Sequence, residues 1–592
     1  MSRAARLRFS GSDMYLKIIL IVVCGFLWGL GLGCQSSTGS APIPPQQSAM
    51  PPSGENRAAA YYYFSSAQMK LKEGDITEAL WLLEKAIHYD PVSTLLKLEL
   101  AELLLIQKDS EKALHLIQQV LHDDPKNSNA LILAARIHQQ QEALPEAKAF
   151  LERALENTPN DPNIYLYLGR IYWSENDLAN AERIFRQMVA QFPLSYAAHY
   201  FWGKVSVAQG KNEAAEAAFM RSLELEPSLE EPRLELIKIY QSQKRDPRII
   251  EMYQAILTFN PENAAAALEL AVHYRQTGKP EQGLALLTEL GQRSQEEDGI
   301  LSYVFESYLE TKQYELAAWV ILGMLRGAPE NSELHYLAGV ACEGLKLVFS
   351  ALDHLGRVSP DSRFYKNAVV QRAMLLRNSG KLDQSIEVVQ NAVQHEPKNA
   401  DYYLYLGIFY EELEQYKKAL EILHRGLAVD NKNIRLHFRV GVIHDKAGHK
   451  QDAIAAMKDV LQIQPQDAEA LNYLGYTYAD LGIHLDEAEN LIQNALKMKP
   501  DDGYITDSLA WVYYKQGKYK EALRWLTKAE ELVPDDPVIL EHLGDVHLKL
   551  NSHEQALKYY QRSLDIKDNA KDRDLLEEKI RALNHDSSQP KQ

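Results

Sequence analysis

The stretch PNIYLYLGRIYWSENDLANAERIFRQMVAQFP, residues 162–193, contains the pattern that decides the fold of this chain. Tyr165, Leu168 and Gly169 lie at helical spacing, so they would share one face of a first helix. Because Gly169 has no side chain, a second helix can approach that face closely. Pro193 ends the second helix, since the residue before a proline avoids helical geometry. The stretch therefore predicts a hairpin of two helices.

Prolines mark the same hairpin at regular intervals along the chain. Successive members of the first series are 34 residues apart, and after an irregular stretch near Pro360 the series returns: Pro91, Pro125, Pro159, Pro193, Pro227 and Pro261, then Pro397, Pro465, Pro500 and Pro534. Such a period indicates a stack of helix hairpins, each burying its apolar face against its neighbours. About fifteen units fit between residues 60 and 568, so we expect an all-α superhelical solenoid.

A small residue on each of the two helices recurs in the same places. The pairs are Gly169 with Ala181, Gly203 with Ala215, Gly407 with Ala419, Gly441 with Ala453, Gly475 with Ala488, and Gly544 with Ala556. In its period and in these small positions the chain resembles the tetratricopeptide repeat (TPR) over most of residues 58–568. The resemblance implies a TPR solenoid whose concave groove, lined by the first helices, binds other proteins.

Departures from the repeat divide the predicted array. Ile237 and Ile249 replace the small pair, Gln295 replaces a repeat proline, and residues 339–360 form a shortened unit. Regular stacking would be weaker there, so a bend or a break is expected. The predicted parts are an N-terminal TPR array over residues 58–261, irregular TPR units over 262–365 and a C-terminal TPR array over 366–568.

The end of the chain carries one more amphipathic segment. Leu576, Ile580 and Leu583 share one face of a capping helix predicted over residues 569–585. Such a helix would cover the apolar surface that the last repeat leaves open. Residues 586–592 are polar and are predicted to be disordered.

The amino terminus has the features of an export signal. Four basic residues, the last of them Lys17, precede an apolar run over residues 18–32. The run is short for a membrane span, which needs about 20 residues. Met14 begins a more compact signal and is therefore a candidate for the true start of the protein.

Cys34 follows this run directly, and the residues before it resemble the bacterial lipobox. The resemblance implies that residues 1–33 are a lipoprotein signal peptide and that Cys34 carries the lipid, which includes palmitate-type acyl chains. Gln35 then favours the outer membrane under lipoprotein sorting rules. An uncleaved single-span anchor is the alternative. Residues 34–57 are rich in proline and serine, which predicts a solvated tether.

Composition and charge argue against nucleic-acid binding and against a metal or cofactor site. The chain has 81 acidic and 64 basic residues, a net charge of -17, which repels the phosphates of nucleic acids. Its 18 histidines and 3 cysteines form no HExxH or paired-cysteine motif, so we expect neither a metal nor another cofactor. Cys342 falls at an apolar packing position, which predicts a buried and unreactive thiol.

Two acidic pairs, Asp501 with Asp502 and Asp535 with Asp536, could be read as a general acid and a general base. Each pair follows a repeat proline, at the point where a helix begins. A carboxylate there accepts hydrogen bonds from the free amide groups of the first turn. Helix capping is therefore the favoured interpretation, and the chain is expected to have no catalytic site and no enzymatic activity.

The TPR resemblance also implies which side chains would face a partner. First-helix positions two, five, nine and twelve of a unit point into the groove of TPR proteins. Aromatic residues at those positions are Trp173, Tyr200, Phe438, Tyr476, Trp511 and Tyr514. Such side chains anchor a bound protein through a large apolar area. The alternative is that they pack between adjacent first helices.

Residues 471–550 are more specific than a generic repeat. The stretch, which begins LNYLGYTYADLGIHLDEAENLIQNALKMKPDDGYITDSLAWVYY, is similar to the C-terminal part of large bacterial TPR lipoproteins. In that family the superhelix binds a carboxyl-terminal processing protease and delivers cell-wall hydrolases to it. The similarity implies a lipid-anchored adaptor at the periplasmic face of the outer membrane, with the periplasmic protease and the hydrolases as partners. A scaffold for exopolysaccharide or outer-membrane secretion components is the alternative.

Overall fold

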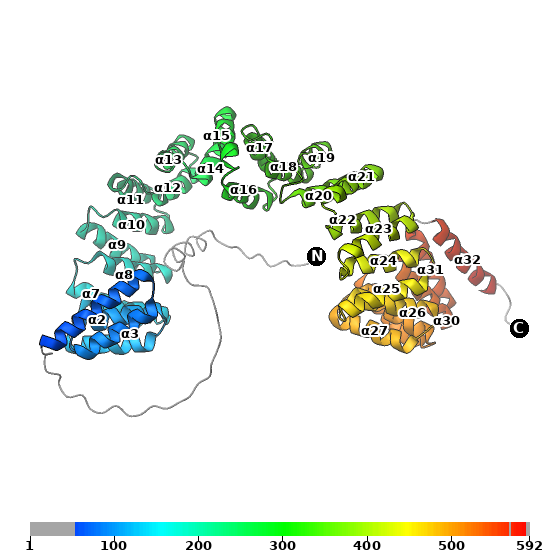
Figure 1. Ribbon diagram of the computed structural model, residues 1–592, viewed down its shortest axis with the longest axis horizontal. Helices are drawn as coiled ribbons and strands as arrows, with labels where there is room; N and C mark the ends of the chain where they lie inside the picture. Colours follow the sequence, from blue (N-terminus) through cyan, green and yellow to red (C-terminus); the bar gives the residue numbers. More distant parts are fainter. Residues whose placement is uncertain (1–53, 568–569, 588–592) are drawn as a thin grey trace, which may run out of the picture. The chain divides into compact units, whose positions relative to one another are not determined.

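Helices are the only regular elements among the residues that the structure describes (Figure 1). The structure is a computed structural model, and it describes residues 54–567 and 570–587. Within these residues α2 to α31 alternate as fifteen first and fifteen second helices, which confirms the predicted all-α repeat fold. The predicted signal peptide of residues 1–33, the lipidation site Cys34 and most of the predicted tether lie outside the described residues.

The helices have the following bounds. The first helices are α2 (Gly54–Glu73), α4 (Thr94–Ile106), α6 (Ser128–Gln140), α8 (Pro162–Ser174), α10 (Tyr196–Ala208), α12 (Glu231–Ser242), α14 (Ala264–Gln276), α16 (Asp298–Val304) with the π-helix η1 (Phe305–Leu309), α18 (Ser332–Gly344), α20 (Tyr365–Asn378), α22 (Ala400–Glu412), α24 (Ile434–Lys446), α26 (Ala468–Leu481), α28 (Gly503–Lys515) and α30 (Pro537–Lys549). The second helices are α3 (Ile76–Tyr89), α5 (Ser110–Asp123), α7 (Leu144–Asn157), α9 (Leu178–Gln191), α11 (Asn212–Leu225), α13 (Asp246–Phe259), α15 (Pro280–Arg293), α17 (Tyr314–Leu325), α19 (Val348–Gly356), α21 (Leu382–His395), α23 (Tyr416–Val429), α25 (Lys450–Ile463), α27 (Leu485–Met498), α29 (Tyr519–Leu532) and α31 (His553–Ile566); α32 (Ala570–Ser587) follows them.

Two compact units divide the described chain between Lys211 and Asn212. The first unit contains four packed hairpins, α2 with α3 to α8 with α9, and ends with α10. The second unit begins with α11, continues with ten hairpins from α12 to α31, and ends with α32. Within each unit the helices pack on the next one along the chain, as a repeat stack requires, except that α15 packs on α17 rather than on α16.

The hairpin predicted from residues 162–193 forms as α8 and α9. A β-carbon on Gly169 would lie only 2.4 Å from the ring of Phe185, so the glycine is what lets the two helices approach. Ala181 and Phe185 are both fully buried at this contact. The predicted close approach is therefore confirmed.

Between the two helices of each repeat, the same turn position has a left-handed backbone conformation, with φ between 56° and 82°, and the turn between α26 and α27 has a second such residue, His484, with φ of 49°. The residues at the shared position are Gly74, Lys108, Glu142, Asn176, Gly210, Lys244, Gly278, Lys312, Lys346, Gly380, Glu414, Gly448, Gly482, Gly517 and Asn551. They lie 34 residues apart, except for the interval of 35 from Gly482 to Gly517. The interval also holds through residues 262–365, where the proline series is irregular. The turn between the helices is thus a more regular marker of the repeat than the proline after them.

Residues 262–365 differ from the rest in how their second helices pack. α15 contacts α17, its counterpart in the next repeat, at very short range. A β-carbon on Gly291 would lie 1.9 Å from the carbonyl oxygen of Met324, and one on Gly327 would lie 1.9 Å from that of Thr288. Glycine therefore permits a contact between second helices in this part of the array.

The acidic residues before α28 and α30 have the predicted capping geometry. Asp502 accepts hydrogen bonds from two backbone N–H groups in the first turn of α28, at 3.0 and 3.1 Å. Asp536 does the same for α30, at 2.9 and 3.1 Å. Asp535 has a left-handed backbone and forms an ion pair with Arg562 at 2.9 Å. Capping and pairing thus account for these carboxylates, as predicted for Asp502 and Asp536.

The two ends of the described array differ slightly from the predicted bounds. α2 begins at Gly54, inside the last residues of the predicted tether of residues 34–57. α32 extends to Ser587, into the predicted tail of residues 586–592. Leu576 and Leu583 of α32 are 0% and 4% exposed and pack with Tyr560 of α31. Among residues 54–567 and 570–587, no helix has the length and hydrophobicity that a membrane crossing needs.

Candidate partner-binding surface

Consecutive first helices in the second unit pack on one another. α22 contacts α24, α26 contacts α28, and α28 contacts α30. Two ion pairs join α22 to α24, since Asp401 lies 3.3 Å from Arg435 and Glu411 lies 3.2 Å from Arg439. Phe438, Tyr476, Trp511 and Tyr514 lie on α24, α26 and α28, and we call these four residues the first-helix surface.

Trp511 of this surface contacts residues of its own helix and of α30. Its indole stacks on the ring of Tyr514, with centroids 4.7 Å apart, and on the imidazole of His542 of α30, at 4.1 Å. The ammonium group of Lys515 lies 5.1 Å from the indole centroid. The indole nitrogen is buried and has no hydrogen-bond partner. Trp511 therefore packs between adjacent first helices and remains partly exposed.

A buried ion pair lies directly beneath Trp511. His542 Nδ1 lies 2.8 Å from Asp507 Oδ1, and both side chains are 8% exposed. Burial alone would lower the pKa of His542, but the charge and hydrogen bond of Asp507, with Asp545 and Glu541 nearby, raise it. No motif in the sequence predicts this pair. Its only signal is the separation of 35 residues, which places two side chains at the same level on adjacent first helices.

The other predicted groove residues are also partly buried. The rings of Phe438 and Tyr473 meet edge to face at 5.8 Å, and burial raises the pKa of Tyr476. Trp173 lies 5.6 Å below the ammonium group of Lys204, and Tyr200 packs edge to face on the next residue at 5.3 Å. Trp173 and Tyr200 belong to the first unit, so the structure gathers only the other four residues on one set of helices.

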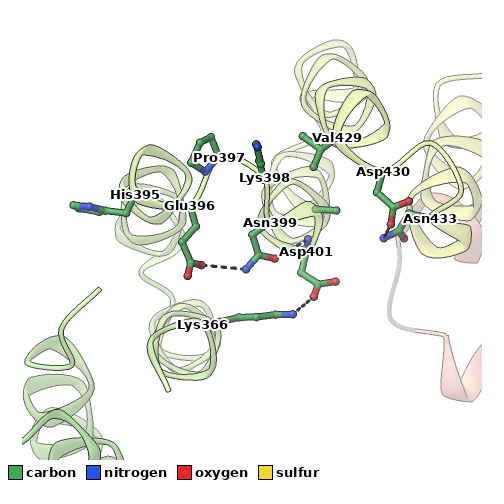
Figure 2. Close-up of a pocket in the computed structure, with 11 residues that line it drawn as sticks. Lys366, His395, Glu396, Pro397, Lys398, Asn399, Asp401, Val429, Asp430 and Asn433 are labelled. Atoms are coloured by element: carbon green, nitrogen blue, oxygen red, sulfur yellow. Dashed lines mark hydrogen bonds and ion pairs between the residues drawn. The ribbon is translucent and has the colours of Figure 1, made fainter. Parts of the chain in front are cut away.

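A depression of about 810 Å³ lies among the ends of α20 to α24 (Figure 2). In Figure 2 the ammonium group of Lys366 points to the carboxylate of Asp401, with which it forms an ion pair. Asn399 donates a hydrogen bond to Glu396 at 3.1 Å and caps α22. These groups maintain the local helix ends. The depression therefore has a structural explanation without a ligand.

Cys342 and a histidine cluster are two further candidate sites among the described residues. Cys342 is 3% exposed, which confirms its predicted burial, and burial raises the pKa of its thiol, which disfavours the reactive thiolate. His444, His449 and Asp452 form the one group of three potential metal ligands found among the described residues. The sequence motifs did not predict this cluster, because its members lie on both sides of a turn.

Models of the tetratricopeptide repeat match more than half of the chain. The matches cover residues 104–171 and 376–437, residues 166–229 and 441–502, residues 248–323, and residues 505–569. They span regular and irregular repeats alike.

Two curated relatives match parts of the chain. A TPR repeat-containing protein of Pseudomonas aeruginosa is 31% identical over 199 residues, which is 33% of this chain and 33% of the relative. The BBSome complex member BBS4 of Bos taurus is 31% identical over 112 residues, 19% of this chain and 21% of that protein. The chain thus matches a third or less of the length of these relatives.

Solved structures include similar repeat arrays. A chain of the APC/C hetero-tetramer Cut9-Hcn1 is 14% identical, with 77% of this chain and 96% of that chain covered and a TM-score of 0.32. YrrB, described as a TPR protein with an unusual peptide-binding site, is 16% identical, with 34% of this chain and 100% of that chain covered and a TM-score of 0.27.

Proposed function

The chain belongs to the tetratricopeptide-repeat family, and we propose that it is a non-catalytic scaffold that binds other proteins through the first-helix surface. Repeat arrays of this kind present extended binding surfaces, and the family generally serves as scaffolds. The observation that carries the proposal is the gathering of Phe438, Tyr476, Trp511 and Tyr514 on three consecutive first helices. Aromatic side chains that are already held in place lose little entropy when a partner binds.

The location that we propose is the periplasmic face of the outer membrane, with the protein anchored by lipid on Cys34. The basic residues, the apolar run and the lipobox-like residues before Cys34 support this proposal. Mass spectrometry of the mature protein tests it. An acylated N-terminal cysteine is expected, and an intact segment before Cys34 would contradict the proposal in favour of an uncleaved anchor.

The partners that we propose are a periplasmic carboxyl-terminal processing protease and its cell-wall hydrolase substrates. The similarity of residues 471–550 to adaptor lipoproteins supports them. A pull-down from detergent extracts with the mature chain tests the proposal, and recovery of the protease or a hydrolase is the expected result. Recovery of an outer-membrane barrel or a polysaccharide synthase instead would favour the secretion scaffold.

A pair of tryptophan variants locates the binding surface. Trp511 on α28 and Trp525 on α29 are both partly buried, but only Trp511 belongs to the first-helix surface. Trp511→Ala, alone or with Tyr514→Ala, should reduce partner recovery at least about tenfold, as expected for a central aromatic anchor. Trp525→Ala, matched in the size of the lost ring, should leave recovery unchanged. Equal losses in both variants would place the binding site elsewhere.

A further inference from the structure

Three potential metal ligands converge at the turn between α24 and α25. His444 lies in the last turn of α24, His449 immediately precedes α25, and Asp452 lies in the first turn of α25. One ligand atom from each residue lies within 4.8 Å of those of the other two. The two imidazole centroids are 6.0 Å apart, and His444 Nδ1 lies 3.9 Å from Asp452 Oδ2. Two nitrogen donors and one oxygen donor therefore surround a common point.

His444 is prepared for a ligand by its surroundings. Its Nδ1 atom is buried and has no hydrogen-bond partner, and its side chain is 18% exposed. Metals bind an imidazole through an unprotonated ring nitrogen, and no hydrogen bond to Nδ1 of His444 competes for that role in the structure. A bound cation would also satisfy a buried nitrogen that is otherwise costly to leave unpaired.

The lysines near the turn are paired with other carboxylates. Lys446 lies 2.9 Å from Glu411, and Lys450 lies 2.6 Å from Asp445. Asp452 is 65% exposed, and its carboxylate faces His444. The carboxyl end of α24 favours a cation, whereas the amino end of α25 opposes one, so the helix dipoles largely cancel at this point. Local charge thus leaves Asp452 available as a ligand.

We propose that His444, His449 and Asp452 form a zinc-binding site at the turn of the α24 and α25 hairpin. Zinc takes imidazole nitrogens at about 2.0–2.1 Å and carboxylate oxygens at about 2.0–2.2 Å in tetrahedral geometry. Ligand atoms in such a site are about 3.3 Å apart, so His449 and Asp452 close on the metal by about 1–2 Å. Both side chains are exposed, and rotation about their side-chain bonds supplies this movement.

Three protein ligands leave one position of a tetrahedral zinc ion open. Water fills this position in the free protein, and a side chain of a bound protein can replace the water. The site lies on the hairpin that carries Phe438 of the first-helix surface, yet its existence does not depend on any partner. A failure of zinc binding would therefore leave the proposed function intact, and a failure of the proposed function would leave the zinc site intact.

Isothermal titration of the full chain with zinc chloride tests the proposal, with protein purified without a histidine tag. One zinc ion is expected to bind this site, and His449→Asn and Asp452→Asn should each weaken its binding at least about tenfold. The exposed His122 on α5 provides a matched control, because His122→Asn removes an imidazole from the surface and should leave the affinity unchanged.

The same variants give a second readout. Zinc should raise the thermal unfolding temperature of the natural chain and of His122→Asn, and it should raise that of the two site variants less. Far-ultraviolet circular dichroism shows whether each variant is folded, and substitution of two exposed residues should preserve the helices. Absence of zinc binding by the natural chain, or equal affinity in the site variants and the control, would overturn the proposal.

Discussion

At Gly169 the space for a side chain is already occupied by the ring of Phe185. That ring is fully buried and stacks on Phe201, with centroids 5.4 Å apart, so it has little room to move. A β-carbon at residue 169 would therefore push the two helices of the repeat apart. Other glycines have room for a side chain, since a β-carbon on Gly299 of α16 would meet nothing within 4 Å.

The variant Gly169→Ala should lower the free energy of unfolding by about 1–3 kcal/mol, because an overpacked core shifts side chains and backbone. Gly299→Ala is the matched control and should be neutral or stabilising by up to about 1 kcal/mol, since alanine favours helix. Differential scanning calorimetry measures both. Equal unfolding temperatures for the two variants would show that the approach of α8 to α9 is not limited by this glycine.

The buried pair of His542 and Asp507 should make stability depend on pH. The pKa of His542 is raised in the folded state, so its contribution is fully present below the unfolded value of about 6.5. The contribution is lost as pH rises through the raised folded pKa. Thermal unfolding of the natural chain should therefore move to lower temperature as pH rises above about 6.5, relative to Asp507→Asn, which lacks the charge that raises the pKa.

A histidine whose partner carboxylate is exposed serves as the control for this pH dependence. His437 Nδ1 lies 4.0 Å from Asp459, whose side chain is 54% exposed. Solvent screens such a pair, so Asp459→Asn should keep the pH dependence of the natural chain. A curve for Asp507→Asn that runs parallel to that of the natural chain would be inconsistent with a stabilising charge on His542.

At the scale of single helices, α32 covers the apolar surface of the last repeat. Its buried face carries Leu576, whereas the neighbouring Leu575 is 54% exposed. Lys579 of α32 also reaches back to Glu541 at 2.8 Å and to Asp545 at 2.7 Å, both on α30. Apolar packing and ion pairs thus fasten α32 to the last repeat.

Substitution of two adjacent leucines distinguishes a loss of packing by α32 from a change in its helix propensity. Leu576→Ala should destabilise the last hairpin by about 2–5 kcal/mol, the range for a fully buried leucine, whereas Leu575→Ala should change stability by less than about 0.5 kcal/mol. Hydrogen exchange of α31, followed by mass spectrometry, reports the difference. Unchanged exchange in Leu576→Ala would mean that α32 does not protect the repeat beneath it.

Most helix positions could be predicted from the sequence, because repeated small residues and prolines act locally. Gly169 acts on Phe185 within its own hairpin, and Asp502 acts on the first turn of the helix that follows it. The π-helix after α16 and the contact of α15 with α17 could not be predicted in the same way. Both depend on how neighbouring repeats fit together, which no short pattern encodes.

The candidate site was predicted less completely, for a similar reason. The repeat register placed Trp511 on a first helix, but its stacking on His542 depends on the rotation between two successive repeats. His444, His449 and Asp452 meet across a helix end and a turn, so no fixed helical spacing relates them. Side chains from one helix face are predictable, whereas groups that meet between elements require the structure.

For the molecule as a whole, stability is expected to be a sum of contacts between neighbours. Each repeat packs mainly on the next, so a local defect should spread only to adjacent repeats. Gly169→Ala should accordingly speed hydrogen exchange in α8 and α9 and leave α28 to α31 unchanged, and Leu576→Ala should do the reverse. Simultaneous loss of protection along the entire chain in either variant would indicate a single cooperative unit instead.

The left-handed turns suggest a route to a more heat-tolerant protein. Six of the fifteen turn positions carry a charged residue with a long side chain: Lys108, Glu142, Lys244, Lys312, Lys346 and Glu414. Each holds a conformation that costs such residues about 1–2 kcal/mol, and glycine avoids that cost while losing about 0.5–1 kcal/mol in backbone entropy. Glycine at all six would therefore add small, independent gains along the array, outside the residues proposed to bind partners or zinc.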